Sequence, residues 1–377
     1  MAASPLQFQP PAVMQCTEPT RLVKSVILTG HGGIQKVDVE DTPIPLRLQE
    51  DHVEVEVHYC GMNFTDNYLR LGIIKSNSFP VIMGSECAGI VTRTGSEATE
   101  FKVGEKVLCL QMQGGLFREM VHVQKKYCFK IPGNINLCHA VCLGLNFLVA
   151  HMCLFEIGKL KTTQIVFMQS IGGGVGTAVL QLAQTVPRVR ILGTASEVKH
   201  EQLRNLGANR TYSHSDNYAQ RVLDLNPYGV DIVINSNGGS DIDKCVEMLK
   251  PCGKLINIGS NSSATYPGNS VWGLLRPSWD AKAFCSSDVI RRAYTMTGLN
   301  IGKLLETDRE KMQSVLTEIF ELRSQGTISP RAHNVLPFGR VQDAMTQLCT
   351  RENYGKVVLV IRNSAEVVLP TDLEEDA

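Results

Sequence analysis

The 377-residue sequence has no excess of charge of either sign, because 37 lysines and arginines balance 37 aspartates and glutamates. Such a balance gives no strong basic field that would attract nucleic acid or acidic lipids. The sequence also has no continuous run of eighteen apolar residues, so we expect no segment that spans a bilayer. It contains no internal repeat of the length that a solenoid would need. We therefore expect no nucleic-acid partner and no membrane span.

Cysteine is present, but not in pairs. Twelve cysteines are scattered along the chain with no C-x-x-C motif and no secretion signal, which indicates reduced thiols rather than a disulfide framework. Cys138 and Cys142 lie at helical spacing beside His139, but we expect no metal there. With 43% hydrophobic residues, the chain is long enough to bury a large core in two domains. We expect a cytoplasmic protein, with peripheral contact at the vesicle or mitochondrial outer membrane as the alternative.

Hydrophobic patterning predicts these two domains. Residues 22–146 contain short strands and turns, which indicates a twisted, mostly β domain. Residues 147–327 alternate strands with helices, as a right-handed parallel sheet requires. Residues 328–362 contain a helix and a final strand, and we expect them to return to the first domain. The proline-containing residues 1–21 and the acidic residues 363–377 are expected to be flexible tails.

A glycine-rich turn follows the apolar run Ile165 to Met168 and precedes an apolar helical pattern. Glycines in this setting permit a tight turn and close backbone approach to a pyrophosphate, while the helix N-terminus favours an anion. Strand, turn and helix together predict nucleotide binding by Gly172, Gly173, Gly174, Val175 and Gly176.

The strand after this turn indicates which nucleotide is bound. An NAD site would want a carboxylate at the strand's end, to accept hydrogen bonds from the ribose hydroxyls. Here the strand is followed by Ser196 and Lys199, which could bind an extra ribose phosphate; Glu197 is the one residue that argues for NAD. Alternatively, Ser196 caps the following helix and Lys199 is solvated. We predict NADP(H) as the cofactor.

Ordered motifs along most of the chain resemble one known family. They are C-G-M-N-F-T-D-N-Y-L-R-L-G (60–72), F-P-V-I-M-G-S-E-C-A-G-I-V (79–91), the glycine turn, G-T-A-S-E-V-K-H-E (193–201), V-D-I-V-I-N-S-N-G-G (230–239), L-P-F-G-R-V-Q-D-A-M (336–345) and G-K-V-V-L-V (355–360). From about residue 23 to 362 the chain resembles a medium-chain dehydrogenase/reductase of the zinc-independent quinone oxidoreductase group, in the vesicle amine transport protein branch. The resemblance implies an α/β fold, in which a Rossmann-type, doubly wound parallel sheet accompanies a GroES-like, mostly β domain.

The same resemblance implies that no catalytic zinc is bound. Zinc-dependent relatives have a cysteine where this chain has Asn63, and a histidine where it has Ser85 before Glu86. Neither an amide nor a hydroxyl replaces a thiolate or an imidazole around zinc. The passage from Val107 to Glu119 is also too short for the four-cysteine structural lobe of those relatives. We predict no metal site.

Without a Lewis acid, hydride addition to a quinone or a conjugated carbonyl needs less help than alcohol oxidation does. A hydrogen-bond donor near the substrate oxygen and exclusion of water would be enough. Asn63 is the candidate donor to a carbonyl or to the cofactor ribose, and Tyr68 the candidate proton donor. The alternatives are helix capping for Asn63 and simple packing for Tyr68.

The resemblance also implies cofactor contacts at Gly259, at Asn300 near the nicotinamide, and at His214, where relatives have a tyrosine beside the adenine. Departures at Ile74, Val149 and His151 replace polar groups of many quinone reductases, and residues 262–300 shape the pocket. The leading hypothesis is an NADPH-dependent reductase of quinones or α,β-unsaturated carbonyls. The competitor is a non-catalytic NADP-binding protein at vesicle or mitochondrial surfaces.

The segment Ala293 to Ile301 is rich in β-branched and apolar residues and is predicted to be a late strand. In the family that the chain resembles, this strand extends the sheet and meets its counterpart across a two-fold axis. We therefore expect a homodimer, with an internal strand of a monomer as the alternative.

Overall fold

The computed structural model describes residues 10–11, 18–76, 78–239, 241–261 and 286–362. The acidic tail, most of the N-terminal tail and residues 262–285 of the expected pocket-shaping segment lie outside the described residues. One boundary changes: the first strand begins at Thr20, so the end of the predicted 1–21 tail already belongs to a sheet.

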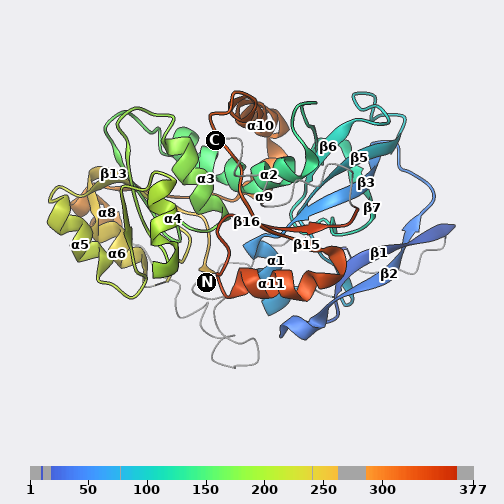
Figure 1. Ribbon diagram of the computed structural model, residues 1–377, viewed down its shortest axis with the longest axis horizontal. Helices are drawn as coiled ribbons and strands as arrows, with labels where there is room; N and C mark the ends of the chain where they lie inside the picture. The colour runs from blue at the N-terminus through green and yellow to red at the C-terminus, as the bar shows by residue number, and fades with distance from the viewer. Residues whose placement is uncertain (1–9, 12–17, 77, 240, 262–285, 363–377) are drawn as a thin grey trace.

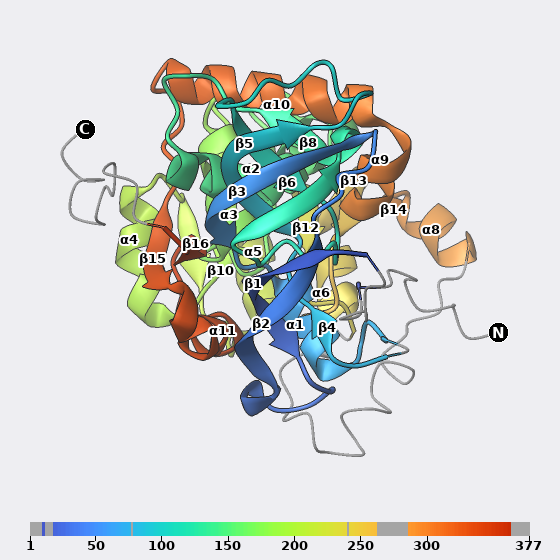
Figure 2. The ribbon, with the colours of Figure 1, turned by 90° about the vertical axis from the view of Figure 1, so that its right-hand side faces the viewer.

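The first domain is mostly β, and its strands are short because turn residues interrupt the alternating apolar pattern. A larger sheet has the order β15-β16-β3-β5-β6-β8, with β7 also paired to β3, and a smaller one has the order β2-β1-β4. Its elements are β1 (Thr20–Leu28), β2 (Val37–Pro45), β3 (His52–Gly61), α1 (Phe64–Leu71), β4 (Val81–Ile82), β5 (Glu86–Thr94), β6 (Lys106–Leu110), β7 (Met120–Gln124), β8 (Cys128–Lys130), β15 (Ala332–Pro337), α11 (Val341–Cys349) and β16 (Lys356–Val360). In Figure 2, β3, β5 and β6 lie side by side with α10 above them.

The second domain is built on a parallel sheet with the order β11-β10-β9-β12-β13-β14. Its elements are β9 (Ile165–Met168), α3 (Gly174–Ala183), β10 (Arg190–Thr194), α4 (His200–Asn205), β11 (Arg210–Tyr212), α5 (Tyr218–Leu225), β12 (Val230–Asn235), α6 (Asp241–Glu247), β13 (Leu249–Asn257), α8 (Ser286–Arg292), β14 (Thr295–Gly298), α9 (Ile301–Thr307) and α10 (Arg309–Ser324). β9 and β12 are buried at every position, as strands covered on both faces must be. The predicted fold, a Rossmann-type sheet with a GroES-like β domain, is confirmed (Figure 1).

The C-terminal segment returns to the first domain. β16 pairs antiparallel with β3, which places Val358 opposite Gly61. In Figure 1, α11 and β15 accordingly lie beside the N-terminal strands rather than beside the parallel sheet.

A long apolar helix joins the two domains. α2 (Leu137–His151) continues into a π-helical turn (Met152–Ile157) and packs against α3, α10 and β5. By length and composition the segment Leu137–Ile157 could cross a membrane. It contains no unbroken apolar run of eighteen residues, because polar residues interrupt it. A buried core helix passes the same test, and 72% of its most apolar window is buried.

The predicted strand over residues 293–301 is shorter than expected. β14 covers only Thr295–Gly298, because Asn300 begins α9 by accepting a hydrogen bond from the backbone N–H of Lys303. β14 pairs in parallel with β13 and is the edge strand of the described sheet.

Candidate active site

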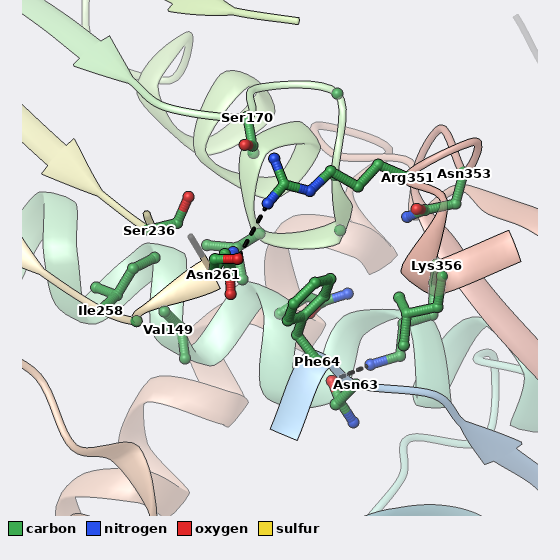
Figure 3. A pocket seen from close by; sticks show the side chains of 18 of the residues that line it. Asn63, Phe64, Val149, Ser170, Ser236, Ile258, Asn261, Arg351, Asn353 and Lys356 are labelled. Atoms are coloured by element: carbon green, nitrogen blue, oxygen red, sulfur yellow. Dashed lines mark hydrogen bonds between the residues drawn. The ribbon is translucent and has the colours of Figure 1, made fainter. Parts of the chain in front are cut away.

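Residues of both domains line one cavity of about 400 Å³. Its wall includes all but one of the site residues named from the sequence, namely Asn63, Tyr68, Gly172, Gly173, Gly174, Val175, Gly176, Ser196, Lys199, His214 and Gly259. Figure 3 shows Asn63 and Lys356 on one side of this pocket and Ser170 on the other, with Arg351 between them. The fold thus brings together predicted site residues that lie almost 200 positions apart in the sequence, from Asn63 to Gly259.

Asn300 is the exception. Its neighbours Leu299 and Ile301 line the pocket, but Asn300 itself does not, and its side chain is exposed. That Asn300 borders the nicotinamide stays a prediction; in this structure its side-chain carbonyl oxygen caps α9.

The glycine turn leaves space where a phosphate would approach. A Cβ at Gly173 would meet only the carbonyl oxygen of Ser170, at 3.4 Å, so this side of the turn is open. A Cβ at Gly174 would overlap the amide of Asn146, and one at Gly176 would overlap the backbone of Ile171. Gly174 and Gly176 therefore allow close packing of the turn. At Gly173 the N-terminus of α3 is open to a ligand.

A buried hydroxyl without a partner lies beside this turn. Ser170 lines the pocket, has a left-handed backbone (φ 56°), and its Oγ has no hydrogen-bond partner. Buried polar atoms are nearly always satisfied, so an unpaired one in a pocket wall indicates a missing ligand group. The turn and Ser170 together fit a bound dinucleotide.

The cationic part of the pocket includes Lys199, which the alternative interpretation placed in solvent. Lys199 is buried rather than solvated, and its Nζ donates to the carbonyl oxygens of Arg351 (2.6 Å) and Asn353 (2.8 Å). Loss of water and the nearby Arg351 lower the pKa of Lys199. Ser196 makes no side-chain capping bond, so neither half of the alternative, a helix cap and a solvated lysine, describes the structure.

Arg351 was missed by the sequence analysis. It lines the same pocket, has a left-handed backbone (φ 57°), and donates to the carbonyl oxygen of Asn261 at 3.2 Å. Its position just before the G-K-V-V-L-V motif was the available signal. His214 also lines the pocket, and desolvation followed by the Arg351 charge lowers its pKa. Glu197, the residue that argued for NAD, is exposed and outside the pocket wall.

The side chain of Asn63 has no free hydrogen to donate. Its Nδ2 donates to the carbonyl oxygen of Gly61 and to Oε2 of Glu86, both at 2.9 Å, while its Oδ1 accepts from Nζ of Lys356 at 2.7 Å. Asn63 is also the N-cap of α1, and its backbone N–H donates to Asp66 at 2.8 Å. The capping alternative therefore describes Asn63 well, and its amide orientation is fixed by its partners.

Glu86 and Lys356 form a buried ion pair beside Asn63. Glu86 Oε2 lies 2.5 Å from Lys356 Nζ, and Glu86 Oε1 accepts from the backbone N–H of Leu145 at 2.6 Å. That N–H is free because α2 kinks at Gly144, where a Cβ would overlap the Glu86 carboxylate. Lys356 belongs to the G-K-V-V-L-V motif, but it was not among the site residues predicted from the sequence.

Asp66 is a second buried carboxyl next to this pair. Burial raises its pKa to about 7, against the lowering effect of the Asn63 N–H and the Lys356 charge. One ammonium cannot neutralise two buried carboxylates, so the protonated form of Asp66 is favoured far more than in water and predominates below about pH 7.

Tyr68 lies in the pocket wall, but the three positions that depart from many quinone reductases do not all do so. The Tyr68 hydroxyl donates to Oδ1 of Asn261 at 2.5 Å, and burial raises its pKa to about 12. Val149 lines the pocket, whereas Ile74 and His151 do not. His151 is buried and its Nε2 lies 3.0 Å from Glu318, so only the Val149 departure changes the pocket wall directly.

Within the described ranges, no group of three or more His, Cys, Asp or Glu side chains is placed to hold a metal ion. At the position of the zinc-dependent relatives' cysteine, the structure has the Asn63 amide and, bound to it, a lysine ammonium.

Comparison with known proteins agrees with this geometry. The profile of the alcohol dehydrogenase GroES-like domain matches residues 49–133, and that of the zinc-binding dehydrogenase domain matches residues 206–359. The synaptic vesicle membrane protein VAT-1 homologs of Rattus norvegicus and Homo sapiens are 34% and 33% identical over 90% of this chain, covering 84% and 86% of their own lengths. The chain belongs to the medium-chain dehydrogenase/reductase superfamily, in the VAT-1 branch.

Solved structures of this superfamily share the fold. The human VAT-1 homolog-like protein has a TM-score of 0.77 at 27% identity, covering 91% of this chain and 99% of its own. Quinone oxidoreductase of Escherichia coli, complexed with NADPH, has a TM-score of 0.78 at 20% identity, covering 90% of this chain and all of its own.

Proposed function

We propose that this protein is a zinc-independent, NADPH-dependent oxidoreductase that reduces quinones or α,β-unsaturated carbonyl compounds. The observation that carries the proposal is that one pocket joins an open glycine turn and two cations to a buried polar cluster at Asn63. NADPH, when bound, supplies the hydride. The NADPH complex of the Escherichia coli structure supports the choice of cofactor.

The chain's own residues would hold the cofactor in three places. The turn at Gly173 and the N-terminus of α3 receive the pyrophosphate, and the unpaired hydroxyl of Ser170 completes its hydrogen bonding. Arg351 and Lys199 provide positive charge for a ribose phosphate. Hydrogen bonds between a cation and phosphate oxygens are stronger than those between neutral groups. Gly259, in the same pocket wall, allows the chain to pass close to Tyr68, since a Cβ there would lie 3.1 Å from the Tyr68 hydroxyl.

The remaining wall suits an uncharged, largely apolar substrate. Met62, Phe64, Met112 and Val149 line the same pocket as Asn63 and give it apolar wall surface. A quinone or an enone fits such a pocket, because its reduction places charge only on an oxygen.

Turnover tests this proposal. Purified protein is mixed with NADPH and a panel of quinones and enones, and loss of the reduced cofactor is followed by absorbance. Binding of NADPH is measured separately by quenching of protein fluorescence. We expect both binding and turnover; absence of NADPH binding would contradict the proposal altogether.

The second candidate is an NADP-binding protein with little or no catalysis, acting at vesicle or mitochondrial surfaces. The relatives named synaptic vesicle membrane proteins favour it, as does Val149 in place of a polar group. NADPH binding without turnover of any compound in the panel would support this candidate. For either function we propose a cytoplasmic homodimer formed through the edge of the parallel sheet.

A further inference from the structure

Lys356 is a buried cation in the pocket wall. It lies at the start of β16, its side chain is 2% exposed, and the side chain of Glu86 beside it is fully buried. Figure 3 shows its ammonium directed at Asn63 inside the pocket. Pairing two charges in the interior costs desolvation that their attraction often fails to recover, so stability alone explains the pair poorly.

Three polar side chains near this pair have no free proton to offer a ligand, whereas the Thr65 hydroxyl in the same pocket wall has no recorded partner. Both amide hydrogens of Asn63 are used, the Tyr68 hydrogen is held by Asn261, and Glu86 only accepts. The Lys356 ammonium has three hydrogens. Asn63 Oδ1 and Glu86 Oε2 accept two of them, and no described residue is recorded as accepting the third.

The surroundings hold this ammonium in place. A Cβ at Gly61 would lie 2.6 Å from Glu86 Oε2 and 2.7 Å from Cε of Lys356, so the strand approaches the pair as closely as glycine allows. The pair thus presents a pre-positioned positive charge in a pocket with largely apolar walls. Such a charge acts more strongly on a developing oxyanion than it would in water.

We propose that Lys356 is a catalytic residue whose ammonium binds the carbonyl oxygen of the substrate and stabilises the negative charge that forms there. This inference rests on the proposed function. Addition of a hydride to the β-carbon of an enone forms a C–H bond, moves the C=C electron pair into a new double bond between the α-carbon and the carbonyl carbon, and moves the C=O π pair onto the oxygen. The enolate is held by the ammonium, and water then protonates its α-carbon, so that Lys356 ends each cycle with the same charge.

An oxyanion reporter tests this role without cofactor or turnover. 4-Nitrophenol absorbs differently as phenol and phenolate, so a titration of the protein-bound dye reads the charge in the pocket. We expect the full-length protein to lower the pKa of the bound phenol by about one unit or more, because a cation in contact favours the phenolate.

The variants are chosen so that the fold survives. Lys356→Met alone would leave Glu86 as an unpaired buried charge, so it is combined with Glu86→Gln to keep the cluster neutral. Lys356→Arg keeps both the positive charge and its partner Glu86 and should keep the shift. Lys254→Met is the matched control, since Lys254 donates to the carbonyl oxygens of Ile157 and Gly158 and is not among the residues of the pocket wall. Circular dichroism and NADPH binding check all variants.

The expected result is a shift in wild type, Lys356→Arg and Lys254→Met, and its loss in the double variant. In addition, kcat for the best quinone or enone should fall about 10²-fold or more in the double variant, with the Kd for NADPH unchanged. A wild type that gives no shift, or a double variant that keeps the shift, overturns the role of Lys356. A shift without turnover of any compound shows that Lys356 binds an oxyanion but overturns the proposed reductase function, and with it the catalytic use of that charge.

Discussion

The hydroxyl of Tyr68 donates a 2.5 Å hydrogen bond to Oδ1 of Asn261 and accepts one of 3.0 Å from the backbone N–H of Ser260. Tyr68 lies on α1 of the β domain, whereas Ser260 and Asn261 follow β13 of the parallel sheet. One phenol therefore ties the two domains together at the edge of the pocket. The role predicted from the sequence, proton donation to substrate, would require breaking this link.

Replacing Tyr68 with Phe is expected to destabilise the protein more than it slows the reaction. The half-buried Asn261 and the exposed Ser260 each lose a hydrogen bond, so the free energy of unfolding should fall by about 0.5–1.5 kcal/mol for each bond. Because the pKa of Tyr68 is raised to about 12, no tyrosine ionisation should affect the rate below that range. Urea unfolding and kcat measure the two effects. A loss of kcat beyond about 10²-fold with unchanged stability would restore Tyr68 as the proton donor.

Arg351→Gln should weaken NADPH binding by about tenfold or more and leave NADH binding nearly unchanged. The reason is that a charge-assisted hydrogen bond to the ribose phosphate is lost, which is worth roughly 1.5–3 kcal/mol. Lys199→Glu should discriminate in the same direction, although Lys199 also supports the backbone of residues 351–353. Fluorescence titration with both cofactors gives the two dissociation constants.

Arg331→Gln is the control for this comparison. Arg331 stacks on the ring of Tyr354 and does not line the pocket. Equal loss of NADPH and NADH binding in Arg351→Gln would contradict the assignment of a phosphate site.

Purified protein should contain much less than one zinc per chain. Asn63 and Ser85 offer an amide and a hydroxyl where zinc-dependent relatives offer thiolate and imidazole, and these are poor zinc ligands. Elemental analysis by mass spectrometry decides the matter. Stoichiometric zinc that resists dialysis would overturn both this prediction and the role of Lys356.

Asp66→Asn should flatten the decline in stability between about pH 4 and 7. Burial raises the pKa of Asp66 to about 7, so the folded state favours the protonated acid. The resulting stabilisation is complete below the ordinary pKa near 4 and is lost as pH rises to about 7. From the difference between the two pKa values, this contribution of Asp66 to the free energy of unfolding amounts to at most about 4 kcal/mol. Urea unfolding across this range, with wild type beside the variant, measures it.

Glu54 gives a control of opposite sign. Although burial alone would raise its pKa, hydrogen bonds from Arg93, His122 and Thr92 and the charge of Arg21 lower it to about 2. Its contribution is therefore present above the ordinary carboxyl pKa and lost as pH falls towards 2. Glu54→Gln should flatten the loss of stability as pH falls from about 4 towards 2, where Asp66→Asn should have little effect. A slope unchanged by Asp66→Asn would contradict the buried, protonated acid.

Sedimentation at micromolar concentration should show a dimer. β14 is the exposed edge of the described parallel sheet, and an open edge invites pairing with a second copy. Thr295→Lys places a charge on this edge and should shift the protein towards monomer, whereas Thr346→Lys, on exposed α11, should not. A wild-type species near the chain mass of 41.5 kDa would refute the dimer.

The local pattern of the sequence was enough to predict the parallel sheet and the phosphate turn. Ile165 to Met168, the glycines and the following helix are contiguous, and each residue's role depends on its immediate neighbours. The strand near residue 300 was less predictable, because the capping bond of Asn300 competes with strand propensity over a few residues.

The chemistry of the pocket depended on the tertiary structure. Asn63, Glu86 and Lys356 come from three separate elements. Glu86 and Lys356 are 270 positions apart, and the pairing of β16 with β3 brings them into contact. The sequence determined which chemical groups the chain possesses. The fold decided that the Asn63 hydrogens are consumed and that the lysine charge faces the pocket, because hydrogen-bond saturation is a property of neighbours in space.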